Sequence, residues 1–292
     1  MPGKGFATAM GALAVGLWGA LALFTTGTDG LPPLQVLSLS FAIAFLGGLV
    51  WLAARGKLSW RFARSIPLPA WGLGVGGLFL YHLAYFVALK NAPPAEASLI
   101  AYLWPLLIVL FSALLPGEGL QARHLIAACL GLAGAALLIL VRQEGEAAAG
   151  NALGYGAAMA CALIWSGYSV LNRTQSHVPT EAIGLYCGIV APLGFGLHLG
   201  LEEWVQPSAL QWLALIGLGL GPVGLAFFVW DFGTKHGDLP LLGVLSYGAP
   251  VISTILLVAF GKAPLTGALL LGCVLIVGAA LLAMKPQIRR RA

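Results

Sequence analysis

The chain has 292 residues, of which 60% are apolar and only 9% are charged, and its mean hydropathy is +0.94. A water-soluble domain of this length carries about a quarter charged residues, so the composition excludes an ordinary soluble protein. The net charge of +5 does not indicate a nucleic-acid partner, because the basic residues fall between apolar blocks and not on one face of a domain. The composition therefore predicts a protein whose surroundings are the lipid bilayer.

Apolar runs between charged or Pro/Gly-rich breaks predict ten membrane-spanning helices. A hydrocarbon core about 30 Å thick requires about 20 helical residues, and runs this long and continuous are not typical of barrel strands. The fold class is thus an all-α integral membrane protein. In chain order, the predicted spans are residues 6–24, 34–54, 70–90, 94–116, 123–141, 150–172, 181–201, 209–232, 239–261 and 265–285.

Basic residues are divided unequally between the two sides that these spans define. Only Lys90, Arg142 and Lys262 fall on one side, and acids accumulate there: Asp29, Glu144, Glu146, Glu202 and Glu203. The other side, with both termini, holds Lys4, Arg55, Lys57, Arg61, Arg64, Arg123, Arg173, Lys235, Lys285, Arg289, Arg290 and Arg291. Basic residues mark cytoplasmic loops, so both termini are predicted to be cytoplasmic.

The two halves of the chain resemble each other. At offsets of 144 to 147 residues, the matches are 129–138 with 273–282, Tyr102 and Pro105 with Tyr247 and Pro250, Lys90 with Lys235, and Trp18 with Trp165. Matches in the same order predict two five-helix repeats, residues 1–145 and 146–292. Because five is odd, the second repeat enters the membrane inverted, with the substrate site between the repeats. This pattern favours a transporter over an enzyme and leaves an inverted-repeat channel open.

Ten helices with these paired motifs resemble the EamA-type branch of the drug/metabolite transporter superfamily over the whole chain. Within it, the sequence resembles the YddG-type exporters through Tyr81-His82-x-x-Tyr85, Tyr102-x-Trp104-Pro105 and Trp165. The resemblance implies a basket of helices around a central cavity, with aromatic and other neutral amino acids moving outward. The small four-helix exporters of the superfamily use a glutamate in their first helix. No acid lies between Lys4 and Asp29 here, so proton exchange by that route is not expected.

Matched prolines and mid-span tryptophans are the first candidates for the lining of the cavity. Pro105 and Pro250 break the fourth and ninth spans at equivalent positions, and paired breaks point to a binding site, although a packing kink is the alternative. Mid-span indoles can stack on a planar or cationic ligand or can pack as core. These indoles are Trp18, Trp104 and Trp165.

Polar side chains in the spans are the second set of candidates. They can bind the amino and carboxylate groups of an amino acid, or they can bond to a neighbouring helix. The candidates are His82, Tyr85, Tyr102, Ser246 and Tyr247. His198 is not accompanied by other candidate residues and is expected to be structural.

Asp231 is the deepest acid, and Lys235 follows one helical turn later. An i,i+4 ion pair is the favoured interpretation, and a coupling or substrate role is the alternative. Small residues four apart predict close helix contacts at Gly72/Gly76, Gly184/Gly188, Gly196/Gly200 and Gly217/Gly221.

Together these features predict an exporter of neutral, especially aromatic, amino acids in a bacterial inner membrane. It would be a monomer and an uncoupled facilitator that works by alternating access, with no cofactor and no metal site, since no Walker, HExxH or CxxC motif occurs. Export is implied by the resemblance alone. The alternatives are a multidrug or metabolite exporter, proton-coupled or not, a passive channel, and an intramembrane enzyme using His82 and Asp231.

Overall fold

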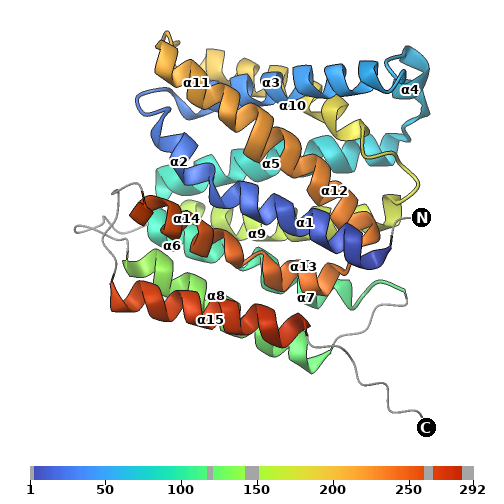
Figure 1. The fold of residues 1–292 in the computed structure, drawn as a ribbon. Helices are drawn as coiled ribbons and strands as arrows, with labels where there is room; N and C mark the ends of the chain where they lie inside the picture. The colour runs from blue at the N-terminus through green and yellow to red at the C-terminus, as the bar shows by residue number, and fades with distance from the viewer. Residues whose placement is uncertain (1–2, 117–120, 142–150, 260–265, 285–292) are drawn as a thin grey trace.

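The computed structural model describes residues 3–116, 121–141, 151–259 and 266–284, and within these ranges the chain forms helices and no strand (Figure 1). The first half contains α1 (Lys4–Gly19), α2 (Leu21–Thr26), α3 (Pro33–Ala54), α4 (Trp60–Ser65), α5 (Leu68–Asn91), α6 (Pro94–Ala101), α7 (Trp104–Ser112) and α8 (Ala122–Val141). Helices α1 and α2 share one span, and so do α6 and α7. The short helix α4 lies between the second and third spans.

The second half repeats this plan. It contains α9 (Ala152–Asn172) with the 3₁₀ turn η1 (Arg173–Gln175), α10 (Ala182–Leu201), α11 (Ala209–Leu218), the π-helical segment η2 (Gly219–Leu225), α12 (Ala226–His236), α13 (Leu239–Leu245), α14 (Gly248–Ala259) and α15 (Gly267–Met284). The predicted boundary at residues 145 and 146 lies outside the described residues, as do Arg142, Glu144, Glu146, Lys262, Lys285, Arg289, Arg290 and Arg291.

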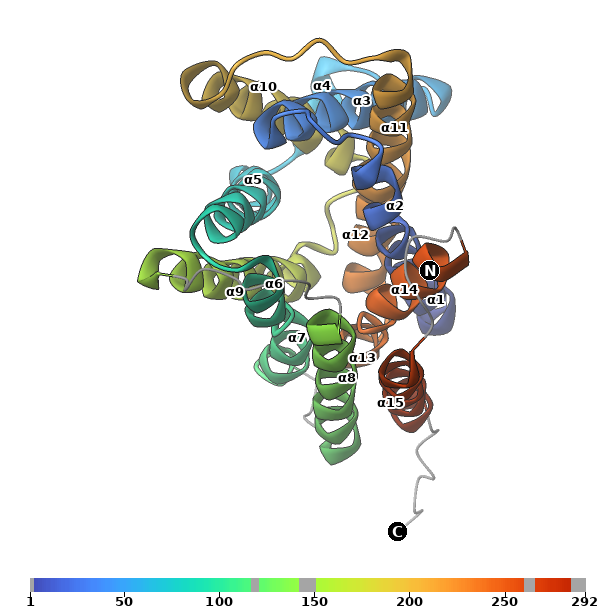
Figure 2. The same cartoon turned by 90° about the vertical axis from the view of Figure 1, so that its left-hand side faces the viewer.

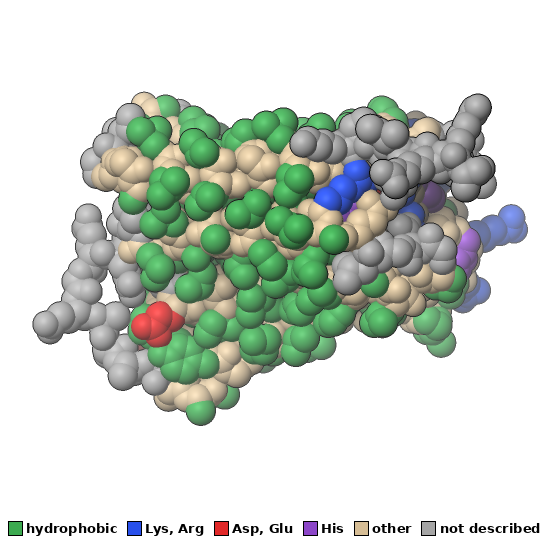
Figure 3. Space-filling view, turned by 90° about the horizontal axis from the view of Figure 1, so that it is seen from below, with side chains coloured by type: hydrophobic (Ala, Val, Ile, Leu, Met, Phe, Trp, Pro, Cys, Tyr) green, Lys and Arg blue, Asp and Glu red, His purple; other side chains and the backbone are tan. Residues whose placement is uncertain are grey.

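Length and hydropathy confirm the predicted spans. In the described chain, nine helical stretches are long and apolar enough to cross a membrane, and the broken fourth span contains the shorter apolar stretch Glu96–Ser112. Large apolar side chains cover the outside, as Figure 3 shows for one face of the molecule. Such a surface suits lipid and not water.

Helices of the two halves pack as reciprocal pairs. Helix α1 packs on α12 and α9 on α5, while α3 packs on α10 and α8 on α15. The paired helices run antiparallel: the Glu202 carboxylate, just after α10, accepts a hydrogen bond from Leu34 N–H at the start of α3 (3.1 Å). Exchange of the two halves reproduces the same set of contacts, as expected for a twofold relation between inverted repeats.

Several crossings depend on glycine. A Cβ on Gly48 of α3 would lie 2.7 Å from the Gly184 Cα of α10, and a Cβ on Gly233 of α12 would lie 2.5 Å from the Gly11 Cα of α1. Only glycine permits these approaches. The predicted contacts at Gly184, Gly188 and Gly217 are confirmed. The prediction is wrong for other positions, which meet nothing within 4 Å because their faces point outward: Gly72, Gly76, Gly196, Gly200 and Gly221.

Helix α1 begins and α15 ends at the same end of the bundle (Figure 1). This end, called the basic end below, also carries the basic residues Arg55, Lys57, Arg61, Arg64, Arg123, Arg173 and Lys235. Figure 2 views the bundle from the opposite end, where the helices are seen end-on around a central region bordered by α3, α5, α9 and α12.

Candidate substrate site

The fourth and ninth spans are interrupted where the sequence predicts. Two residues separate α6 from α7, and Pro105 is the second residue of α7; two residues also separate α13 from α14, and Pro250 is the third residue of α14. The broken spans pack on each other, because a Cβ on Gly243 of α13 would lie 2.9 Å from the Pro105 carbonyl oxygen. The two breaks thus lie at equivalent positions of the repeats.

Three of the predicted tryptophans meet in one cluster between the repeats. The ring centroid of Trp18 lies 5.6 Å from that of Trp165 and 6.2 Å from that of Trp104. Phe227 and Trp230 of α12 complete the cluster, with Trp230 only 5.0 Å from Trp18. Edge-to-face packing at these distances is favourable, and it presents several aromatic faces in one place. Trp18 is also anchored by its indole N–H, which donates to the Pro222 carbonyl in η2 (3.1 Å).

Helix α5 brings polar groups to the same cluster. Tyr81 packs against Trp165 at 5.2 Å, and His82 lies 6.2 Å from Phe227. The Nδ1 of His82 bonds to the Leu78 carbonyl in its own helix (2.7 Å). Tyr85 stacks on Tyr81 at 6.2 Å, and its hydroxyl lies 3.3 Å from the Ser98 hydroxyl of α6. His82 and Tyr85 therefore lie at the cluster, as their spacing predicts.

The structure does not bring Ser246 and Tyr247 to this cluster. Ser246 donates to the Leu242 carbonyl one turn earlier in the chain (2.7 Å), and Tyr247 is fully buried against Gly131 of α8. Tyr247 belongs to a second hydrophobic core between α7, α8, α13 and α15, and Tyr102 packs at the edge of that core. The interruption of the ninth span directs Ser246 and Tyr247 away from the centre, whereas Tyr102 lies between this core and Tyr81 of the aromatic cluster. Ser246 and Tyr247 pack as structural residues do, and their contact with substrate stays a prediction.

Asp231 and Lys235 form a buried ion pair at the basic end. Lys235 Nζ lies 2.8 Å from one carboxylate oxygen of Asp231 and 2.9 Å from the other. Asn172 donates to the first oxygen (3.0 Å) and Thr180 to the second (2.6 Å). Lys235 also donates to the Val178 carbonyl (3.0 Å). Both carboxylate oxygens are thus occupied, as a buried carboxylate requires.

Two helical segments related by the repeat differ in burial. Residues 81–87 of α5 are all half-buried, and among residues 81–91 only Ala88 is buried. The equivalent segment of α12, 145 residues later, contains Trp230, Asp231 and Thr234, each at most 1% exposed. The bundle is therefore closed around α12 at the basic end and more open along α5 toward the opposite end.

A model of the EamA-like transporter family matches residues 5–140 and again residues 152–285. The chain belongs to this family. The double match places one family unit on each half of this EamA-like transporter, as the repeat in the sequence indicates.

Several similar proteins are named aromatic amino acid exporters. The chain is 50% identical to the aromatic amino acid exporter YddG of Ancylobacter novellus over 95% of this chain and 96% of that protein. It is 26% identical to the YddG of Escherichia coli, over 94% of this chain and 96% of that one. A crystal structure with 50% sequence identity has a TM-score of 0.92 and covers 96% of this chain and 97% of that chain.

Sequence reasoning missed several members of the transporter's aromatic cluster. Phe227 and Trp230 stand 145 residues after His82 and Tyr85, so the offset that relates Lys90 to Lys235 would have identified both. Tyr168 follows Trp165 by three residues and packs on it at 5.2 Å. Their signal lay in the repeat and in helical spacing and not in any local motif.

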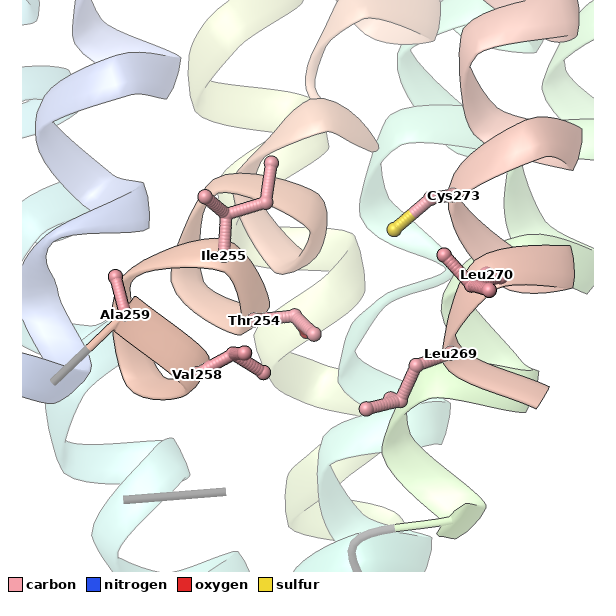
Figure 4. A pocket seen from close by; sticks show the side chains of 7 residues that line it. All are labelled: Thr254, Ile255, Val258, Ala259, Leu269, Leu270 and Cys273. Carbon is pink, nitrogen blue, oxygen red and sulfur yellow. The ribbon is translucent and has the colours of Figure 1, made fainter. Parts of the chain in front are cut away.

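A pocket of about 410 Å³ opens elsewhere on the transporter, between α14 and α15 (Figure 4). Its walls are Thr254, Ile255, Val258, Ala259, Leu269, Leu270 and Cys273. Ile255 and Leu270 are more than half exposed, and the Thr254 hydroxyl already donates to the Pro250 carbonyl (2.8 Å). None of the predicted site residues lines this apolar pocket, so the aromatic cluster remains the candidate site.

Proposed function

We propose that this EamA-like transporter exports aromatic and other neutral amino acids across a bacterial inner membrane, with both termini in the cytoplasm. The observation that carries the proposal is the aromatic cluster between the repeats, which combines stacking faces with hydrogen-bonding groups of α5. Such a lining suits a planar side chain with a polar head group. The 50% identity to a named aromatic amino acid exporter supports the same substrate class.

The mechanism that fits this arrangement is alternating access without ion coupling. Proton coupling needs a buried group that can exchange its proton during transport. Asp231 is the buried acid of the described spans, and Lys235, Asn172 and Thr180 occupy both of its oxygens. Transport would then run down the substrate gradient, outward when the cytoplasmic concentration is higher.

A multidrug or metabolite exporter is the competing proposal, since aromatic stacking alone does not select amino acids. An intramembrane enzyme is less well supported, because Phe41, Tyr81 and Phe227 surround His82, and among the described residues it makes no hydrogen bond with Asp231. Absence of any chemical change in the cargo after incubation with purified protein would distinguish transport from catalysis.

The decisive experiment is uptake of radiolabelled phenylalanine and tryptophan by purified protein in liposomes, with and without a pH gradient. Saturable uptake that unlabelled substrate inhibits, and that the gradient leaves unchanged, would support an uncoupled amino acid carrier. The variant Trp104→Ala should lower uptake strongly, whereas Trp60→Ala, at a residue 71% exposed outside the cluster, should not. No uptake above empty liposomes by folded protein would contradict the amino acid proposal, and non-saturating flux would indicate a channel.

A further inference from the structure

The aromatic cluster is built from residues that the internal repeat relates in pairs. Trp18 faces Trp165 with ring centroids 5.6 Å apart, and His82 faces its equivalent Phe227 at 6.2 Å. Residues that are equivalent and in contact lie on either side of the twofold axis between the repeats. A substrate at this point would therefore touch the same position of both halves.

The paired positions differ in chemistry on α5 and α12. The three residues Tyr81, His82 and Tyr85 of α5 correspond to Ala226, Phe227 and Trp230 of α12. The indole N–H of Trp230 is already used, since it donates to the Ser169 hydroxyl (3.1 Å). Helix α5 thus offers polar atoms at the axis where α12 offers only carbon and aromatic faces.

The hydrogen bond of His82 determines which of its ring nitrogens carries the proton. A carbonyl oxygen only accepts hydrogen bonds, so Nδ1, 2.7 Å from the Leu78 carbonyl, must be the donor. The rings packed around His82 are Phe41, Tyr81 and Phe227, which offer no carboxylate to an imidazolium. A neutral ring with a proton on Nδ1 leaves Nε2 as an acceptor. This half-buried side chain makes no other hydrogen bond among the described residues.

We propose that the amino acid binds across the axis in one orientation, with its α-ammonium group on His82 Nε2 and its side chain against Phe227 of α12. This inference rests on the proposed function and identifies His82 as the residue that recognises the ammonium group of the substrate. An ammonium group is a donor without acceptor capacity, so it matches Nε2, and the aromatic faces around His82 favour a cation.

Donors for the carboxylate of the substrate lie nearby. The indole N–H groups of Trp18 and Trp230 donate to described residues, whereas those of Trp104 and Trp165 make no such bond within the described chain. N–H donors suit a carboxylate. Asp231 is excluded as the ammonium partner, because binding there would break its pair with Lys235. Glu96 of α6, which accepts a hydrogen bond from the Tyr155 hydroxyl, is the remaining acid near α5 and serves as the rival in the test.

The experiment measures competition for phenylalanine uptake by two ligands that differ only in the ammonium group: unlabelled phenylalanine and 3-phenylpropionate. In wild-type liposomes, phenylalanine should compete better. His82→Phe should weaken competition by phenylalanine about tenfold to hundredfold, the range for a lost hydrogen bond to a charged group, and should leave 3-phenylpropionate unchanged. His82→Gln, which keeps an acceptor, should retain much of the preference. Direct binding to purified protein in detergent repeats the comparison if a variant transports too slowly.

The matched control is Phe227→Leu at the equivalent position of α12, which should weaken both ligands alike. Equal weakening of both ligands by His82→Phe, or loss of the preference in Glu96→Gln instead, would overturn the proposal. Failure of the wild-type protein to bind phenylalanine at all would instead overturn the proposed function. Thermal unfolding of each purified variant separates a lost contact from a lost fold.

Discussion

Residues 81–91 of α5 and residues 226–236 of α12 occupy equivalent positions in the two repeats, but they differ in burial and in polar contacts. Both end near an equivalent lysine, Lys90 or Lys235. Lys235 is buried in an ion pair, whereas Lys90 is exposed and forms no ion pair with a described residue. The position of Asp231 is taken by Phe86 in α5. The polar network around Asp231 at the basic end therefore has no counterpart in residues 81–91 of α5.

This difference shows how two similar repeats can hold two conformations. In an inverted-repeat carrier, the opposite state arises when each half adopts the conformation of the other. The α12 conformation is stabilised by the contacts of Asp231, Asn172, Thr180 and Lys235, and α5 has no side chains to form an equivalent set. We therefore expect the state closed at the basic end to be the more stable one in the absence of substrate.

The first prediction compares access to the two segments directly. Tyr81 is half-buried, and its equivalent Ala226 is fully buried. In a protein whose four native cysteines are replaced by alanine, Tyr81→Cys should react readily with a membrane-impermeant thiol reagent applied on the side opposite the basic end. Ala226→Cys should remain essentially unlabelled from either side, because its environment excludes the reagent.

Mass spectrometry of the labelled protein provides the measurement, and full labelling of both variants in denaturant provides the control. Equal labelling of the two positions in the folded protein would contradict the difference in burial. Added phenylalanine should slow the labelling of Tyr81→Cys if the cluster is the substrate site.

The second prediction breaks the network at α12. Asp231→Ala leaves the Lys235 ammonium 2% exposed without its partner, and an uncompensated buried charge costs about 3–5 kcal/mol in the free energy of unfolding. The double variant Asp231→Leu/Lys235→Met, which removes both charges, should lie much closer to the wild type. Unfolding of purified protein by detergent titration gives the comparison.

The transport rates of these variants sharpen the same test. If the network stabilises only the state closed at the basic end, the double variant should still carry substrate, with a changed balance between the two states. An unchanged free energy of unfolding in Asp231→Ala would show that the ion pair contributes nothing to the fold.

The membrane class, the spans and the repeat follow from sequence because they depend on composition, length and periodicity. The breaks near Pro105 and Pro250 and the pairing of Asp231 with Lys235 follow as well, since proline chemistry and i,i+4 spacing are local. Each of these features can be recognised within one helix or by comparing the two halves of the sequence.

What could not be predicted depends on which helix faces the interior. Gly72 and Gly233 look alike in sequence, yet one points outward and the other touches Gly11. The match with Tyr102 predicts Tyr247 at the centre, but Tyr247 packs against Gly131 because the broken span turns it away. Such outcomes arise from packing between distant segments, which helical spacing within one span does not specify.

The third prediction uses this pair of glycines. Gly233→Ala places a methyl group 2.5 Å from the Gly11 Cα, so α1 and α12 must separate, at a cost of about 1–3 kcal/mol for overpacking. Gly72→Ala meets nothing within 4 Å and should gain up to about 1 kcal/mol from helix propensity. Thermal unfolding of the two variants should therefore shift in opposite directions, and a matching shift would contradict the assigned contacts.

The smallest expected effect concerns the link between the halves at the basic end. Lys57 Nζ lies 2.7 Å from Glu181, but the lysine side chain is 45% exposed, so Lys57→Met should cost only about 0.2–1 kcal/mol.

Burial raises the pKa of Glu181, while the hydrogen bond and charge of Lys57 lower it, and the net pKa lies below the ordinary value. A lowered pKa in the folded state stabilises the protein above the pKa of the unfolded chain, about 4.3, and this contribution is lost as the pH falls through the folded-state value. The difference in stability between wild type and Lys57→Met should therefore be present at neutral pH and shrink in acid. A difference that persists unchanged below that range would show that Lys57 acts through packing and not through the charge of Glu181.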